Sequence, residues 1–413
     1  MRRILFTTLV LGLLSGCPGS SSSGSSSGDT APAPREVKPL TETSRAKLRT
    51  LGEDFAATLS ADDLEAAARF WDAAGLWGRV ADGLDLSGEV ARQAKRSFIA
   101  QFKAKGGVPL HELAGVRVDF RRINEDPEQG ALLLLRGILP EGGLLYAECL
   151  VDDPDAAEPK LIDVYAYANG EFVSRTARRL MAPQLAEASR TSLSKLLGGA
   201  SEDSKHFPKL QSAMESLQSG DPQSALQTLD ALPAAIRRQK SVLIMRMRAA
   251  NALYDPSQEP PVGEEAYLAV LGELKDALST DPRAQLLLTD YHLLKQDYAA
   301  FHTSLETLEG AVGEDAYLTL LHATGYHQAK EHETAVEFGL EALEQEPALD
   351  EQIRLNLVDF LLAAERYEET AEQLRELTAR YGYAWDPHAD SSFAPFLESE
   401  PGQAWWEEHQ AGE

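Results

Sequence analysis

LLHATGYHQAKEHETAVEFGLEAL, residues 320–343, carries the pattern that decides the fold of the C-terminal half of the chain. Its apolar and small residues recur at intervals of three and four, the spacing of one face of an α-helix. The segment predicts a helix, a short turn and a second helix, and Pro347 then closes the second helix.

Two neighbouring segments, residues 286–308 and 355–377, carry the same pattern. Equivalent positions lie 35 residues apart, as Tyr291 and Tyr326 do. Such internal repetition is typical of proteins built by stacking one small helical unit on the next.

Further helical pairs are expected upstream. One covers residues 214–233, and another joins 240–255 to 264–282. About five stacked pairs are enough to bury a continuous core. We therefore expect an all-α solenoid of helical hairpins over residues 205–380.

The repeated unit resembles the tetratricopeptide repeat, whose usual length is 34 residues. The middle segment matches best, because Ala323, Ala335 and Ala342 are small where two helices approach and Tyr326 fills the space between neighbours. The third segment departs from the pattern, with Leu361 where the tyrosine would stand.

That resemblance implies a concave face lined by first-helix residues, which would bind peptides or other proteins. The matching positions in this chain are Thr289, His292, Tyr317, Thr324, His327, Gln328, Gln352 and Asp359.

Residues 1–17, MRRILFTTLVLGLLSGC, combine two arginines, an apolar stretch and a cysteine. The apolar stretch would reach roughly 16 Å as a helix, about half of a hydrocarbon core, which favours a signal sequence over a membrane span. The final LSGC resembles a bacterial lipobox, which implies that Cys17 carries lipid and anchors the chain to a membrane. Pro18 after the cysteine favours the outer membrane, on its periplasmic or surface face.

Residues 18–40 are rich in Ser, Gly and Pro and have almost nothing to bury, so we expect a disordered tether. A linker is expected at 191–204. Residues 381–413 contain five Trp and Phe side chains in a polar segment. They are expected to cap the last repeat, with a docking motif as the alternative.

The apolar spacing in residues 41–190 predicts helices first and strands afterwards. This order favours an α+β domain with helices on one face of a curved antiparallel sheet. Ser60 or Asp62 is expected to cap the second helix. The expected helices are 43–59, 61–77, 90–102 and 172–189, and the expected strands are 115–123, 131–138, 143–153 and 160–172.

This order resembles the nuclear-transport-factor-like, cystatin-related fold. That resemblance implies a cone whose mouth can bind a small molecule or support an isomerase or dehydratase. Strand alternation places Asp163 and Tyr165 on one face, with Tyr146 and Glu148 on a face of the neighbouring strand. These four could line such a pocket and exchange protons, or simply form the half-polar face of an ordinary antiparallel sheet.

The chain has 413 residues and a net charge of −26, of which residues 301–413 carry −20. Such an acidic surface repels nucleic acid, so no nucleic-acid partner is expected. With Cys17 acylated, Cys149 has no disulfide partner and is expected to be a buried thiol. The solenoid histidines lack the spacing of a zincin motif, so we expect them on solvated helix faces, with no metal and no cofactor.

These features together predict a membrane-anchored, non-catalytic scaffold that binds envelope proteins or peptides through its helical repeats. The alternative is a small-molecule site in the α+β domain, with the repeats serving only for localisation.

Overall fold

The computed structural model describes residues 39–412 apart from residues 85, 87, 105, 111–112, 140–142, 180, 182–205 and 259. The predicted signal peptide with Cys17, the linker at 191–204 and nearly all of the tether lie outside these described residues. None of the described helices is long and apolar enough to cross a membrane.

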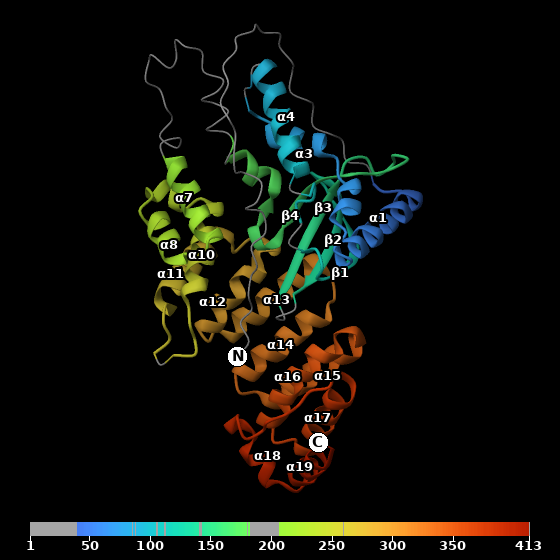
Figure 1. The fold of residues 1–413 in the computed structure, drawn as a ribbon, viewed down its shortest axis with the longest axis vertical. Coiled ribbons are helices and arrows are strands. Elements are labelled where there is room, and N and C mark those ends of the chain that lie inside the picture. Colours follow the sequence, from blue (N-terminus) through green and yellow to red (C-terminus); the bar gives the residue numbers. More distant parts are fainter. Residues whose placement is uncertain are drawn as a thin grey trace. The chain divides into compact units, whose positions relative to one another are not determined.

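The described part of the chain is mostly helical and contains one five-stranded antiparallel sheet (Figure 1). The chain forms two compact units. The first unit ends at Leu278 and the second begins at Ser279. The described helical hairpins before Leu278 therefore belong to the same compact unit as the sheet.

The sheet is a meander whose strands pair in sequence order, β1-β2-β3-β4-β5. The expected strand at 160–172 is in fact two strands, because a 3₁₀ turn at Tyr167–Asn169 and Gly170, with φ 60°, reverse the chain. The strands are β1 Arg117–Asp126, β2 Gly130–Ile138, β3 Leu144–Val151, β4 Leu161–Ala166 and β5 Glu171–Phe172.

Helices cover one face of this sheet, as the order of elements predicts. The other face is also covered along β3 and β4, because every residue of these two strands is buried. α1 (Glu42–Ser60) packs on β1 and β2, and α3 (Ala73–Ala81) packs on β4 and on α4 (Gly88–Ala104). The shared core includes Leu133 and Cys149 from the strands, both fully buried. Burial, together with the charges of Asp163 and Glu148, raises the pKa of the Cys149 thiol. The thiol is therefore unreactive, as the sequence indicated.

The helix expected at 61–77 is broken in the structure. α2 (Leu64–Ala67) and the 3₁₀ helix η2 (Ala68–Phe70) end at Trp71, because Trp71 forms a β-bridge with Leu161. The cap of α2 is Asp63, whose carboxylate accepts the Ala66 N–H at 2.9 Å. Neither predicted cap is used: the Ser60 hydroxyl bonds instead to the backbone of Val118.

The first unit continues with hairpins. α7 packs on α8, α8 on α10, and α10 on α11. Residue Pro222 starts α8, directly after the capping Asp221, as proline suits a first helical turn. The helices are α7 Phe207–Gln218, α8 Pro222–Asp230, α9 Ala234–Arg237, α10 Lys240–Leu253 and α11 Glu264–Leu278.

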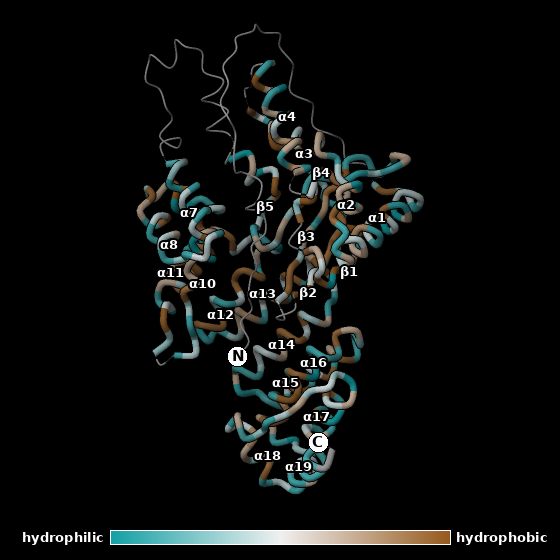
Figure 2. Tube along the Cα trace, viewed as in Figure 1, coloured by the Kyte–Doolittle hydropathy of each residue, from teal (hydrophilic) through white to brown (hydrophobic). Residues whose placement is uncertain are grey.

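The second unit is built from successive antiparallel hairpins. α14 packs on α15, α15 on α16, and α16 on α17, and hydrophilic and hydrophobic positions alternate along these helices (Figure 2). Its elements are η6 Pro282–Leu288, α12 Thr289–Leu294, α13 Tyr298–Val312, α14 Ala316–Gln328, α15 His332–Gln345, η7 Pro347–Leu349, α16 Asp350–Ala363, α17 Tyr367–Tyr381, η8 Ser391–Phe393, α18 Ala394–Glu398 and α19 Glu400–Gly412.

One turn recurs between the paired helices. Gln296, Lys330 and Glu365, 34 and 35 residues apart, all have positive φ, between 56° and 65°. At each, two backbone bonds close the preceding helix, as where Lys330 N–H reaches His327 O and Glu331 N–H reaches Tyr326 O. This is a Schellman cap, which usually takes glycine. Gly220 occupies the same position between α7 and α8.

The C-terminal segment packs on the last hairpin. Phe393, Phe396 and Trp405 form a buried cluster with Leu374 and Leu377 of α17. The Arg375 guanidinium also pairs with Glu408 at 2.8 Å. The aromatic residues therefore belong to a cap that closes the apolar end of the unit.

Candidate functional site

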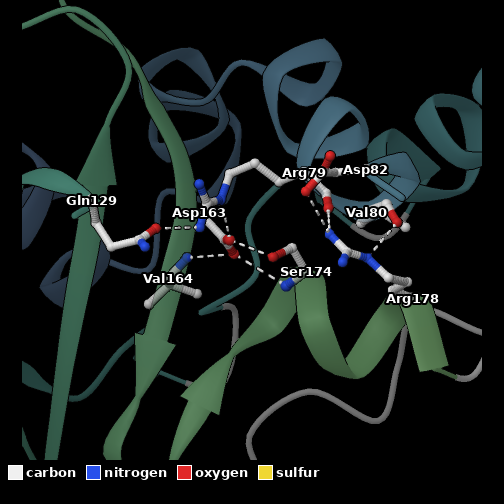
Figure 3. Close-up of polar contacts among 8 residues, drawn as sticks. All are labelled: Arg79, Val80, Asp82, Gln129, Asp163, Val164, Ser174 and Arg178. Carbon is white, nitrogen blue, oxygen red and sulfur yellow. Dashed lines mark hydrogen bonds and ion pairs between the residues drawn. The ribbon is translucent and has the colours of Figure 1, made fainter. Parts of the chain in front are cut away.

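Asp163 on β4 is the centre of a buried polar cluster (Figure 3). Its Oδ2 accepts Arg79 Nε at 2.6 Å and the Ser174 hydroxyl at 2.5 Å. Its Oδ1 accepts the backbone N–H groups of Val164 at 2.9 Å and Ser174 at 3.1 Å. Four donors therefore occupy the acceptor positions of this carboxylate. It fixes the Arg79 guanidinium in place and has no lone pair left with which to act as a base.

The remaining contacts tie α3 to the rest of the unit. Arg79 Nη2 donates to Gln129 Oε1 at 2.8 Å, and its guanidinium lies 5.0 Å from the centroid of the Phe172 ring. Arg178, on the helical segment 173–179, donates to the carbonyls of Arg79 and Val80 and pairs with Asp82 (Figure 3). The cluster thus fastens α3, β4 and the segment after β5 to one another.

The four predicted pocket residues do share one face of the sheet. Glu148 stands directly opposite Tyr165 in the β3–β4 ladder. The rings of Tyr146 and Tyr165 each lie 5.7 Å from the ring of Tyr167, centroid to centroid. Glu148 Oε1 accepts Asn124 Nδ2 at 2.6 Å. The strand alternation therefore placed these side chains correctly relative to one another.

Their accessibility differs from what a pocket requires. Tyr146, Glu148, Asp163 and Tyr165 are each no more than 5% exposed. A reacting group must be reached by its substrate, and these side chains are enclosed in the structure.

The predicted peptide-binding positions lie on α12, α14 and α16, which are the first helices of their hairpins. Thr289 and Tyr317 are buried, at 0% and 5% exposure. The Thr289 hydroxyl donates to Leu286 O at 2.8 Å, and burial, followed by the charge of Asp315, raises the pKa of Tyr317 to about 12. These two positions serve the packing of the unit.

The other six predicted positions retain accessible surface. Asp359 is exposed, and the remaining five are half-buried: His292, Thr324, His327, Gln328 and Gln352. The His327 ring lies 5.1 Å from the ring of the buried Phe360, so α14 and α16 are in contact at this point.

A histidine pair in the second unit was missed by the sequence analysis. His302 on α13 and His322 on α14 stack with their ring planes 7° apart, and their Nδ1 atoms are 2.7 Å apart. His322 is only 7% exposed. The expectation of solvated histidines is therefore wrong for this residue. The sequence does contain a sign of this burial. His322 and Tyr326 are four residues apart, a spacing that places both on the face of α14 that meets α13.

Burial and the neighbouring His302 lower the pKa of His322 to about 4. Burial likewise lowers the pKa of His302, although Glu306 and Glu331 act in the opposite direction. Both rings are therefore uncharged near neutral pH.

Other candidates for ligand chemistry are weak. Within the described ranges, no group of three or more His, Cys, Asp or Glu residues is placed to hold a metal ion. A shallow hollow of about 490 Å³ lies between α7 and α8, lined by Pro208, Lys209, Ser212, Gln227, Thr228 and Ala231. Lys209 is the one charged side chain in that lining, and it forms no cluster that would orient a ligand.

A scan against protein-family models finds no match, and a search of the curated proteins finds no similar sequence.

Proposed function

We propose that this chain is a lipid-anchored protein of the bacterial cell envelope whose helical hairpins form a tetratricopeptide-like solenoid that binds other polypeptides. The observation that carries the proposal is the recurrence of one helix-ending turn at Gln296, Lys330 and Glu365. Equal turns at a spacing of 34 to 35 residues support a repeated helical unit of this class.

The surface of the second unit fits a binding role. Among the described residues, only Val262 and Tyr381 are large hydrophobic side chains with substantial exposure. Recognition would then depend on polar and charged contacts, such as those of Gln352 and Asp359 on α16. The charge of −20 over residues 301–413 favours a partner segment rich in Lys and Arg.

The anchor is proposed from the sequence alone. A lipobox cysteine followed by 23 residues of Ser-, Gly- and Pro-rich chain would hold the folded units near a membrane while leaving them free to meet a partner. Mass spectrometry of the mature N-terminus tests it directly. A diacylglyceryl group on Cys17 is expected, and an unmodified thiol or an intact leader in the native protein would refute the anchor.

The binding role is tested by a pair of charge reversals. Asp359→Lys changes an exposed first-helix position, and Glu372→Lys makes the same change of charge at an exposed position of α17. Affinity capture from envelope extracts with the full chain should lose its partner with Asp359→Lys and keep it with Glu372→Lys. Equal capture by both variants, or no envelope protein above background with the wild type, would count against the proposal.

The alternative, an isomerase-like or other small-molecule site around Tyr146, Glu148, Asp163 and Tyr165, is weakened by the burial of all four side chains. Asp163 in particular cannot act as its base, because that carboxylate is already held by four donors.

A further inference from the structure

The packing of three helices brings together two histidines, the buried His322 and the half-buried His302, which can share only one hydrogen between them. His302 comes from α13 and His322 from α14, and their Nδ1 atoms are 2.7 Å apart. At that distance one Nδ1 donates and the other accepts. If both rings were protonated, two N–H groups would point at each other, and the rings would have to separate.

The surroundings leave little room for such a separation. The His302 ring is stacked on the Tyr326 ring at 4.1 Å, and the His322 ring lies 5.8 Å from Phe338 of α15. At Gly325 the two helices are so close that an added Cβ would lie 2.6 Å from the Phe301 ring and 3.0 Å from the His302 ring. His322 is only 7% exposed, so movement of its imidazole away from His302 requires movement of a helix.

Carboxylates lie near the histidine pair, but they offset only part of the positive charge that protonation of both rings would add. Glu309 Oε1 lies 3.8 Å from His322 Nε2, close enough to favour one added proton. Glu306 on α13 and Glu331 in the turn before α15 act on His302. Glu306, Glu341 on α15 and the Glu314–Asp315 segment act on Glu309. Burial, followed by the charges of Glu306, Glu314, Glu341 and Asp315, raises the pKa of Glu309. Acid therefore also removes the negative charge of Glu309 beside His322.

We propose that the His302–His322 pair makes the packing of α13, α14 and α15 sensitive to pH, so that acidification loosens this part of the second unit. Acid destabilises the folded chain because protonation of these histidines favours the unfolded chain. The histidines bind protons more weakly in the folded chain than in the unfolded chain, whose histidines titrate near pH 6.5. The stabilisation is therefore complete above about pH 6.5 and is lost as the pH falls towards 4, where His322 itself takes up its proton.

The test compares the full chain with a His302→Phe, His322→Phe double variant, which keeps the aromatic stack and removes both titrating groups. His388→Gln is the control, since His388 is an exposed histidine of the C-terminal segment. Urea unfolding is followed at several pH values from 7.5 to 4.5. The unfolding equilibrium constant of the wild type should rise on the order of 50- to 100-fold more than that of the double variant. The control should follow the wild type.

If the double variant does not fold, two measurements on other chains test the proposal. Nuclear magnetic resonance titration of the wild-type histidine rings should show one ring protonating well below pH 6, identified as His322 by its loss in a single His322→Phe chain. Hydrogen exchange at pH 5 should show reduced protection in residues 298–345 before residues 394–412. Parallel unfolding curves, a His322 ring that titrates near pH 6.5, or uniform exchange would overturn the proposal.

Discussion

At the scale of single residues, the structure distinguishes positions that look alike in the sequence. Asp163 and Asp82 are both acidic residues paired with arginine, yet Asp163 is fully buried and the Asp82 side chain is 69% exposed. When an ion pair is broken in a buried place, the remaining charged group cannot form replacement hydrogen bonds with water. At an exposed place it can.

Asp163→Asn should lower the free energy of unfolding by about 2–3 kcal/mol, because it leaves the charge of Arg79 without its partner in a mostly buried place. Asp82→Asn, which disturbs only the pair with Arg178, should stay within about 0.5 kcal/mol of the wild type. Urea unfolding of both variants measures the difference. A loss from Asp163→Asn as small as that from Asp82→Asn would show that the cluster does not stabilise the first unit.

Two helical glycines give a second matched pair. Gly310 in α13 has no atom within 4 Å of an added Cβ, whereas Gly325 in α14 lies against Phe301 and His302. Gly310→Ala should stabilise the chain by about 0.5–1 kcal/mol, through helix propensity alone. Gly325→Ala should destabilise it by about 1–3 kcal/mol, through overpacking. Thermal unfolding distinguishes the two, and a stabilising Gly325→Ala would contradict the close approach of α13 and α14.

At the scale of elements, the sequence predicted most helices and strands because their apolar spacing is regular. It failed where a tertiary contact overrides a local pattern. The apolar spacing through residues 61–77 suggested one helix, but the bridge between Trp71 and Leu161 breaks it. A single strand was expected at 160–172, and the 3₁₀ turn before Gly170 divides it.

For the candidate site, too, the sequence predicted local placement but not the effects of tertiary packing. Alternation along β3 and β4 placed Glu148 opposite Tyr165, but no local pattern could reveal that both are buried. The recurring turn was equally hidden, because Gln296, Lys330 and Glu365 share a backbone conformation and not a residue type. His302 and His322 lie on different helices, so only the packing of those helices brings them together.

The C-terminal segment stabilises the last hairpin by packing on α16 and α17. Deletion of residues 386–413 should uncover the apolar side of α16 and α17 and lower the melting temperature, because Phe396 and Trp405 are almost completely buried there. Trp405→Ala alone should cost about 3–5 kcal/mol. Trp406→Ala, at a half-buried position, is the control and should cost less. An unchanged melting temperature on deletion would instead favour a docking role for the segment.

At the scale of the whole molecule, charge and apolar surface are distributed unevenly. Residues 301–413 carry −20 of the total charge of −26. Large exposed hydrophobic side chains are scarce over the described parts of both units. An acidic surface with few apolar patches resists aggregation and selects partners by charge. This suits a protein that we propose is held at high local density on a membrane.

The most direct test of the central claim is site-specific photocrosslinking in cells that make the full chain. A photoreactive residue at Gln328 on α14 is compared with one at Glu337 on α15, and each chain is made with Cys17 and with Cys17→Ala. The account predicts that a polypeptide of the envelope is captured from position 328 and not from position 337, and that the yield falls without Cys17. Equal capture from the two positions, or capture that does not depend on Cys17, would contradict it.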